Sequence, residues 1–171
     1  MTKKVSIAIL FTLLLSTSVY AKEQKEYVSP DGKYCAYVLA LPTAPYGSGE
    51  SKIALKGENG KILCAKSYGS EDGEHGLGVE KAAWTPDSKF FVYSMSSSGG
   101  HQAWHFPTDF ISTVDFKVRS LDDFIGSITD PDFALIAPDI IITSGRDKTT
   151  LAETNFKVTL SETVKDKKNE P

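Results

Sequence analysis

Several patterns that mark enzymes are missing from this 171-residue sequence. It has no Cys-x-x-Cys pair, no Gly-x-Ser-x-Gly turn around a nucleophile and no glycine loop of the phosphate-binding type. Basic residues do not cluster, and the formal net charge is -3, which argues against binding to nucleic acid or to an anionic membrane surface. From these absences we assign no catalytic residue, no metal ligand and no cofactor.

Long apolar runs are also scarce, with one near the N-terminus. Lys3 and Lys4 precede the apolar residues 5–15, and Ala21 ends a segment of the kind that signal peptidase cuts. No later stretch approaches the roughly 20 apolar residues that a membrane-spanning helix needs. We therefore expect a signal peptide over residues 1–21, cleavage after Ala21, and a periplasmic or secreted bacterial protein.

Cysteine occurs only twice, at Cys35 and Cys64. An even number of cysteines in an exported chain favours a disulfide, and this one would close a loop of about 30 residues. The alternative is a pair of buried thiols that act as small hydrophobic groups. The expectation carried forward is a Cys35–Cys64 bridge.

The strongest positive feature is a phrase that occurs twice. Ser-Pro-Asp-Gly-Lys-Tyr-Cys-Ala-Tyr-Val at positions 29–38 returns 56 positions later as Thr-Pro-Asp-Ser-Lys-Phe-Phe-Val-Tyr-Ser at 85–94. Each copy reads as a turn that leads into an aromatic and aliphatic strand. Residues 137–139, Ala-Pro-Asp, are a faint third copy. Repeated units of this kind indicate repeated β-sheets.

The repeated phrase resembles the repeats of TolB-type β-propellers, in which a Trp commonly precedes the Ser-Pro-Asp. Trp84 stands at that place before the second copy, whereas Val28 stands there before the first. The resemblance implies that the turn joins the innermost strand of a blade to the next strand, in a scaffold for protein contacts. Closed propellers have at least about four blades, and this chain has room for two and part of a third.

The remaining patterns also favour strands. Asn-Gly at 59–60 predicts a hairpin between residues 52–56 and 61–66, and further alternating runs follow. One short helix is predicted near 121–127, with Ser120 as its cap. We therefore predict a single all-β domain over 22–164, an antiparallel meander of propeller-blade-like units that does not close, followed by a disordered tail over 165–171. The alternative fold is a β-sandwich.

Aromatic residues beside glycine-rich turns are the best candidates for binding. Tyr46 lies in Pro-Tyr-Gly-Ser-Gly, and Trp104 and His105 follow Ser-Gly-Gly. Exposed loop aromatics suit recognition, although for Trp104 a place in the core is an equal alternative. A metal site at His101 and His105 is not expected, because side chains four residues apart on the strand predicted there lie about 13 Å from each other.

These observations predict a small exported binding module of the bacterial envelope that holds a protein or a glycan against loops on a rigid sheet. The first alternative is a hydrolase whose site forms between distant loops. The second is a structural subunit that forms a homo-oligomer through an open sheet edge.

Overall fold

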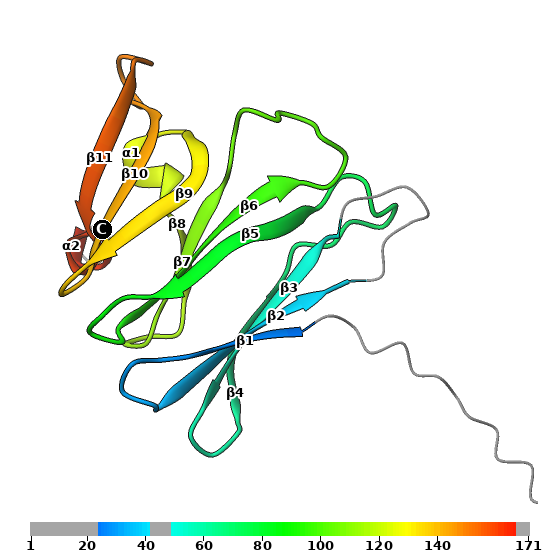
Figure 1. The fold of residues 1–171 in the computed structure, drawn as a ribbon, viewed down its shortest axis with the longest axis vertical. Coiled ribbons are helices and arrows are strands. Elements are labelled where there is room, and N and C mark those ends of the chain that lie inside the picture. Colours follow the sequence, from blue (N-terminus) through cyan, green and yellow to red (C-terminus); the bar gives the residue numbers. More distant parts are fainter. Residues whose placement is uncertain (1–23, 42–48, 167–171) are drawn as a thin grey trace, which may run out of the picture.

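A computed structural model describes residues 24–41 and 49–166. In this part of the chain, eleven strands form three antiparallel sheets, and two short helices accompany them (Figure 1). The first sheet contains β1 (Gln24–Val28), β2 (Tyr34–Ala40), β3 (Ser51–Gly57) and β4 (Ile62–Ser67). The second contains β5 (Leu77–Trp84), β6 (Phe90–Ser97), β7 (Thr108–Ser112) and β8 (Val118–Ser120). The third contains β9 (Ile128–Ile136), β10 (Ile140–Arg146) and β11 (Glu153–Thr159).

Each sheet is a meander whose strands pair in the order of the sequence. The first two sheets have four strands and the third has three. The predicted all-β meander of blade-like units is therefore confirmed, and the units do not close into a full propeller. The third unit has three strands, one fewer than each of the first two. The described residues therefore contain three units, whereas the two clear copies of the repeat indicate two.

The two copies of the repeated phrase build the same turn. In the first, Ser29 Oγ donates to Asp31 Oδ1 at 2.7 Å; in the second, Thr85 Oγ1 donates to Asp87 Oδ1 at 2.8 Å. The fourth residue of each turn has a positive φ, 73° at Gly32 and 63° at Ser88. The turns join β1 to β2 and β5 to β6, so they occupy equivalent corners of the two sheets.

The middle sheet is covered on both faces, and β6 shows how. Phe91, Tyr93 and Met95 belong to a buried cluster shared with the first sheet, together with Ala36, Val38, Ile53 and Leu55. The alternate residues Phe90 and Val92 belong to a second cluster shared with the third sheet. Because side chains alternate along a strand, β6 contributes to two cores at once, as its unbroken apolar sequence predicts.

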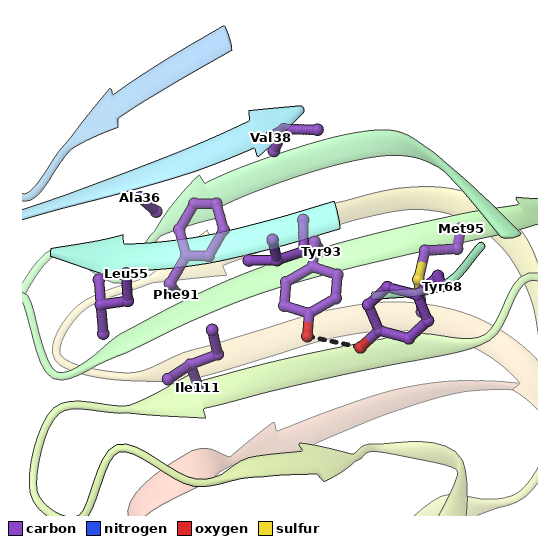
Figure 2. Packing of buried hydrophobic residues seen from close by; sticks show 9 residues of the cluster. Ala36, Val38, Leu55, Tyr68, Phe91, Tyr93, Met95 and Ile111 are labelled. Carbon is purple, nitrogen blue, oxygen red and sulfur yellow. Dashed lines mark hydrogen bonds between the residues drawn. The ribbon is translucent and has the colours of Figure 1, made fainter. Parts of the chain in front are cut away.

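The first core contains a buried polar network. The Tyr68 and Tyr93 hydroxyls lie 2.7 Å apart (Figure 2), and Tyr68 also donates to Asp109. Lys66 Nζ lies 3.1 Å from the Asp109 carboxylate and supplies its counter-charge. Burial, followed by the nearby carboxylate, raises the pKa of Tyr93 far above its usual value, so the phenol stays protonated.

The predicted disulfide is wrong, because Cys35 and Cys64 are both free thiols. Cys35 lies on β2 and Cys64 on β4, with β3 between them. Two strand spacings place the backbones about 9.6 Å apart, beyond the reach of a disulfide. The side chains also point to opposite faces, since Cys64 packs against the first core whereas Cys35 alternates with the buried Ala36.

The helices and the chain ends complete the description. Helix α1 (Asp122–Ile125) confirms the predicted short helix, but its N-cap is Leu121 and no side chain caps it, so the predicted role of Ser120 is wrong. Helix α2 (Leu160–Asp166) includes the first two residues of the predicted tail. The predicted signal peptide lies outside the described residues. In the described part, no helix is both long and apolar enough to span a bilayer.

Candidate functional site

A hollow of about 590 Å³ lies where the second and third sheets meet. The segment after β6 contributes Trp104 and His105, two of the three residues predicted to bind. Helix α1 contributes Asp122, and the β10–β11 hairpin contributes Arg146 and Glu153. We call this hollow the Trp104 groove.

Trp104 lies on a turn, and the strand predicted around it is wrong. Residues 101–104 form a turn in which Gln102 has a φ of 55° and accepts a hydrogen bond from the His105 N–H at 2.8 Å. Because Trp104 is not part of a strand, its side chain is not directed into a core, and it is 45% exposed. Its ring lies 4.6 Å from the Arg146 guanidinium carbon, a cation–π contact, and stacks on the His105 ring at 5.5 Å.

His105 is held by Asp122. Its Nε2 lies 2.6 Å from Asp122 Oδ1, and both side chains are largely buried. The same carboxylate accepts the N–H of Thr108 at 3.0 Å and that of Ile128 at 3.2 Å. Asp122 therefore joins the loop before β7 to the start of β9 and fixes the floor of the groove.

Arg146 is fixed in position from two directions. It lies opposite Glu153 in the β10–β11 ladder, and its Nε donates to Glu153 Oε1 at 2.9 Å. That hydrogen bond is the largest cause of a lowered pKa at Glu153, and the hydrogen bond from Thr129 also lowers it. Trp104 on its face and Glu153 at Nε together restrict how the guanidinium can turn.

One wall of the groove depends on Gly126, which follows α1. Its φ is 108°, and a Cβ atom there would lie 2.2 Å from the Arg146 carbonyl oxygen. The neighbouring Ser127 carbonyl accepts the Arg146 N–H at 2.8 Å, so the two backbones lie in direct contact. A side chain at Gly126 would push the end of β10 away and misplace Arg146.

The acidic groups of the groove already have hydrogen-bond partners, whereas several donors do not. Asp122 and Glu153 are occupied as described, and Asp147 accepts three hydrogen bonds from Thr149 and Thr150, which lower its pKa. Within residues 24–41 and 49–166, the terminal amino groups of Arg146 and the indole N–H of Trp104 have no acceptor. Leu151 beside them is 72% exposed. The groove thus offers donors and apolar surface.

The other predicted residues lie elsewhere. Tyr46 falls outside the described residues. His101 stacks on His75 with ring centroids 5.1 Å apart, while His105 contacts Asp122, so the two histidines serve different contacts. In the described part of the chain, no group of three or more His, Cys, Asp or Glu side chains is placed to hold a metal ion.

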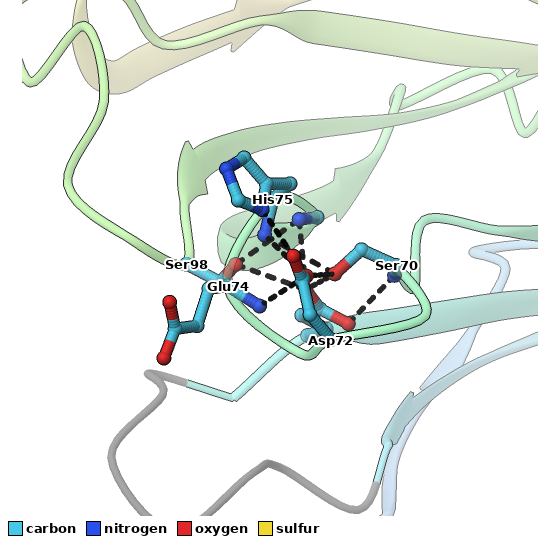
Figure 3. Close-up of polar contacts among 7 residues, drawn as sticks. Ser70, Asp72, Glu74, His75 and Ser98 are labelled. Atoms are coloured by element: carbon cyan, nitrogen blue, oxygen red, sulfur yellow. Dashed lines mark hydrogen bonds and ion pairs between the residues drawn. The ribbon is translucent and has the colours of Figure 1, made fainter.

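A second polar cluster organises the loop between β4 and β5. The buried Glu50 carboxylate accepts hydrogen bonds from the Ser70 hydroxyl at 2.6 Å, the Gly76 N–H at 2.7 Å and the Ser98 hydroxyl at 2.9 Å. Nearby, Asp72 Oδ2 lies 2.5 Å from His75 Nδ1, and its other oxygen accepts the Glu74 N–H (Figure 3). These groups satisfy one another, so the cluster shapes the loop and leaves the Trp104 groove as the candidate site.

Sequence reasoning did not identify Arg146, Glu153 and Asp122. Arg146 follows Trp104 by 42 positions, and only the packing of the third sheet on the second brings the two together. The local signal that could have pointed to two of them is that Arg146 and Glu153 flank a polar segment between two apolar runs.

No family model and no curated protein matches the sequence. Two solved structures match over 83% of this chain and 21% of theirs, so the chain spans about a fifth of those proteins. They are puromycin hydrolase, with a TM-score of 0.43 and 17% identity, and a serine-to-alanine mutant of it complexed with PGG, with a TM-score of 0.46 and 15% identity.

Proposed function

We propose that the protein is an exported binding module of the bacterial envelope, and that the Trp104 groove holds an acidic segment of a protein partner. The observation that carries the proposal is the fixed Arg146 guanidinium, whose terminal amino groups are unused in the described part of the chain. A guanidinium with a free fork of donors binds a carboxylate through two parallel hydrogen bonds. The exposed Leu151 offers a contact for an apolar side chain next to that carboxylate.

A peptide fits this groove better than a sugar ring. A sugar stacks on an open indole face, and here Arg146 already lies over the Trp104 ring with His105 beside it. A glycan that carries uronic acids remains the alternative ligand, and it is one arm of the test below.

Binding also fits the groove better than catalysis. A hydrolase would need a nucleophile beside the His105–Asp122 pair, and among the described residues no hydrogen bond links the His105 ring to a serine or a cysteine. The three carboxylates of the groove are each occupied by two or more groups. These contacts hold the groove side chains in place.

We also infer that the units of the scaffold are TolB-type repeats. Two observations support this: the repeated turn joins the first strand of a sheet to the second, and the Trp84 indole donates to the Tyr27 carbonyl of the preceding sheet at 2.8 Å. In this role the sheets form a rigid base, and the loops and hairpin ends that project from them carry the contacts.

The proposal is tested by NMR with matched peptides. The sequence has two tryptophans, so the indole N–H of Trp104 reports on the groove, while that of Trp84, already bonded to Tyr27, is an internal control. We expect acetyl-Leu-Glu-amide to shift the Trp104 signal saturably and the neutral acetyl-Leu-Gln-amide to leave it in place. Arg146→Gln should weaken that binding about tenfold or more, because it removes charge-assisted hydrogen bonds.

The control variant is Arg119→Gln, which removes the only other arginine, one paired with Asp115 outside the groove. Equal shifts with the acidic and the neutral peptide, or no shift with either, would overturn the proposal. A saturable shift with digalacturonate alone would replace the peptide ligand by an acidic glycan.

A further inference from the structure

The three sheets pack on one another by a fixed rule. The face of the first sheet that bears Ala36 and Val38 packs on the face of the second sheet that bears Phe91 and Tyr93. The equivalent face of the second sheet, 56 positions on, bears Val92 and packs on the third sheet. Each sheet thus uses one face for the sheet before it and the opposite face for the sheet after it. The chain itself shows what covers each kind of face.

Within the described residues, this rule leaves one open face at each end of the series. On the first sheet, Cys35, Tyr37 and Leu39 stand where the second sheet has Phe91, Tyr93 and Met95, yet no described sheet covers them. Tyr37 and Leu39 line a shallow hollow of about 200 Å³ with Ala54, and Lys52 and Lys56 stand at the same hollow. We call this surface the leading face.

The third sheet has the opposite open face. Ile141 points into the second core, so its neighbours Ile140 and Ile142 point away from that core. Opposite them on β9 lie Ile136, which is 46% exposed, and Ala134. We call this apolar surface the trailing face. It occupies the position that Phe90 and Val92 occupy in the middle sheet, where they are fully covered.

Hydrogen bonds also link each turn to the next one along the chain. The Asp31 N–H donates to the Ser88 hydroxyl at 3.0 Å, and the Asp87 N–H donates to the Pro138 carbonyl at 3.2 Å. The third aspartate, Asp139, is 2% exposed, and its N–H has no acceptor in the described part of the chain. A further turn beyond the third would supply one.

We propose that two copies of the chain assemble head to tail, with the trailing face of each covered by the leading face of the other. Two copies place six sheets in one ring, within the four to eight blades that closed propellers contain, whereas three copies would exceed that range. Each of the two contacts joins a trailing face to a leading face, and the dimer closes because a two-fold axis relates the two contacts. Both open faces are then buried by the same kind of face that covers their equivalents within the chain.

The test is the mass of the purified protein in solution, measured by light scattering at micromolar concentration, with one charge placed on each face. We expect the mass of two chains for the unchanged protein, and of one chain for Leu39→Arg and for Ile142→Glu separately. An equimolar mixture of the two variants should recover the dimer, because one interface of the mixed pair is unchanged and the other joins opposite charges.

Val114→Glu is the control, because Val114 is 70% exposed in the turn before β8, away from both faces, and it should leave the dimer intact. Circular dichroism must show that each variant keeps its β structure. A monomeric unchanged protein would overturn the proposal. A dimer broken by only one of the two charges, or a mixture that stays monomeric, would also overturn it, and so would a mass that grows beyond two chains with concentration.

Discussion

The first and second sheets contain the same turn but lie in different environments. Tyr37 and Tyr93 occupy the same position of the repeat, 56 residues apart. Tyr93 is fully buried and bonded to Tyr68, whereas Tyr37 lies on the open face with the Lys56 ammonium 4.3 Å from its ring centre. The comparison teaches that the repeated phrase specifies where a strand begins, while the neighbouring sheet decides what its side chains contribute.

The largest expected difference is between alanine substitutions at these two tyrosines. Tyr93→Ala should lower the free energy of unfolding by about 3–5 kcal/mol, because it leaves a cavity in the core and removes a partner of Tyr68. Tyr37→Ala should cost about 1 kcal/mol or less in the dilute monomer, since its ring is half-exposed. Urea unfolding of both variants measures the difference, and equal losses would mean that the two faces are equally covered.

The next effect concerns Glu50, which joins the two sheets. It accepts hydrogen bonds from Ser70 after the first sheet and from Ser98 after β6, so Glu50→Gln should cost about 1.5–3 kcal/mol. Glu74→Gln, in the loop between β4 and β5 that Glu50 contacts, is the matched control, because the Glu74 side chain is exposed and its loss should cost little.

The same carboxylate predicts a pH dependence. Burial alone would raise the pKa of Glu50, but the hydrogen bonds from Ser70, Ser98 and Gly76 outweigh it and hold the pKa below its usual 4.5. A lowered pKa in the folded state stabilises the fold above pH 4.5, and this contribution is lost as the pH falls below that value. The stability difference between the unchanged protein and Glu50→Gln should therefore shrink in acid, and a difference that grows there would contradict the assigned hydrogen bonds.

The smallest effect tests the turns themselves. Gly32→Ala should cost about 1–2 kcal/mol from backbone strain alone, because φ is 73° and a Cβ atom there would touch nothing within 4 Å. Ser88→Gly relieves the same strain but loses the hydrogen bond to the Asp31 N–H, so its net effect should stay within about 1 kcal/mol of zero. Thermal unfolding of both variants checks this, and a Gly32→Ala protein as stable as the unchanged one would show that the turn is not held at positive φ.

Local chemistry accounts for what could be predicted from the sequence. The two Pro-Asp turns, the Asn-Gly hairpin and the helix at 122–125 each depend on a few adjacent residues, and each was found. The strand predicted around Trp104 was wrong because a positive φ at Gln102 redirects the chain, which alternation of side chains does not reveal. The Cys35–Cys64 bridge was wrong because spacing along the chain says nothing about the strand between them.

The candidate site also combines residues with a local signal and residues without one. Trp104 and His105 could be proposed from their place beside glycines, because that clue is local. Arg146 and Glu153 reach Trp104 only through the packing of the third sheet on the second, a long-range contact without a local signature.

Thiol labelling tests most directly the central claim that the first sheet turns one face to the second sheet and leaves the other open. The denatured protein should show two free thiols, which excludes a disulfide. In the dilute native protein, Cys35 on the open face should react faster than Cys64, which packs against the first core and whose pKa is raised by burial. A chain without free thiols, or one in which Cys64 reacts first, would contradict the arrangement.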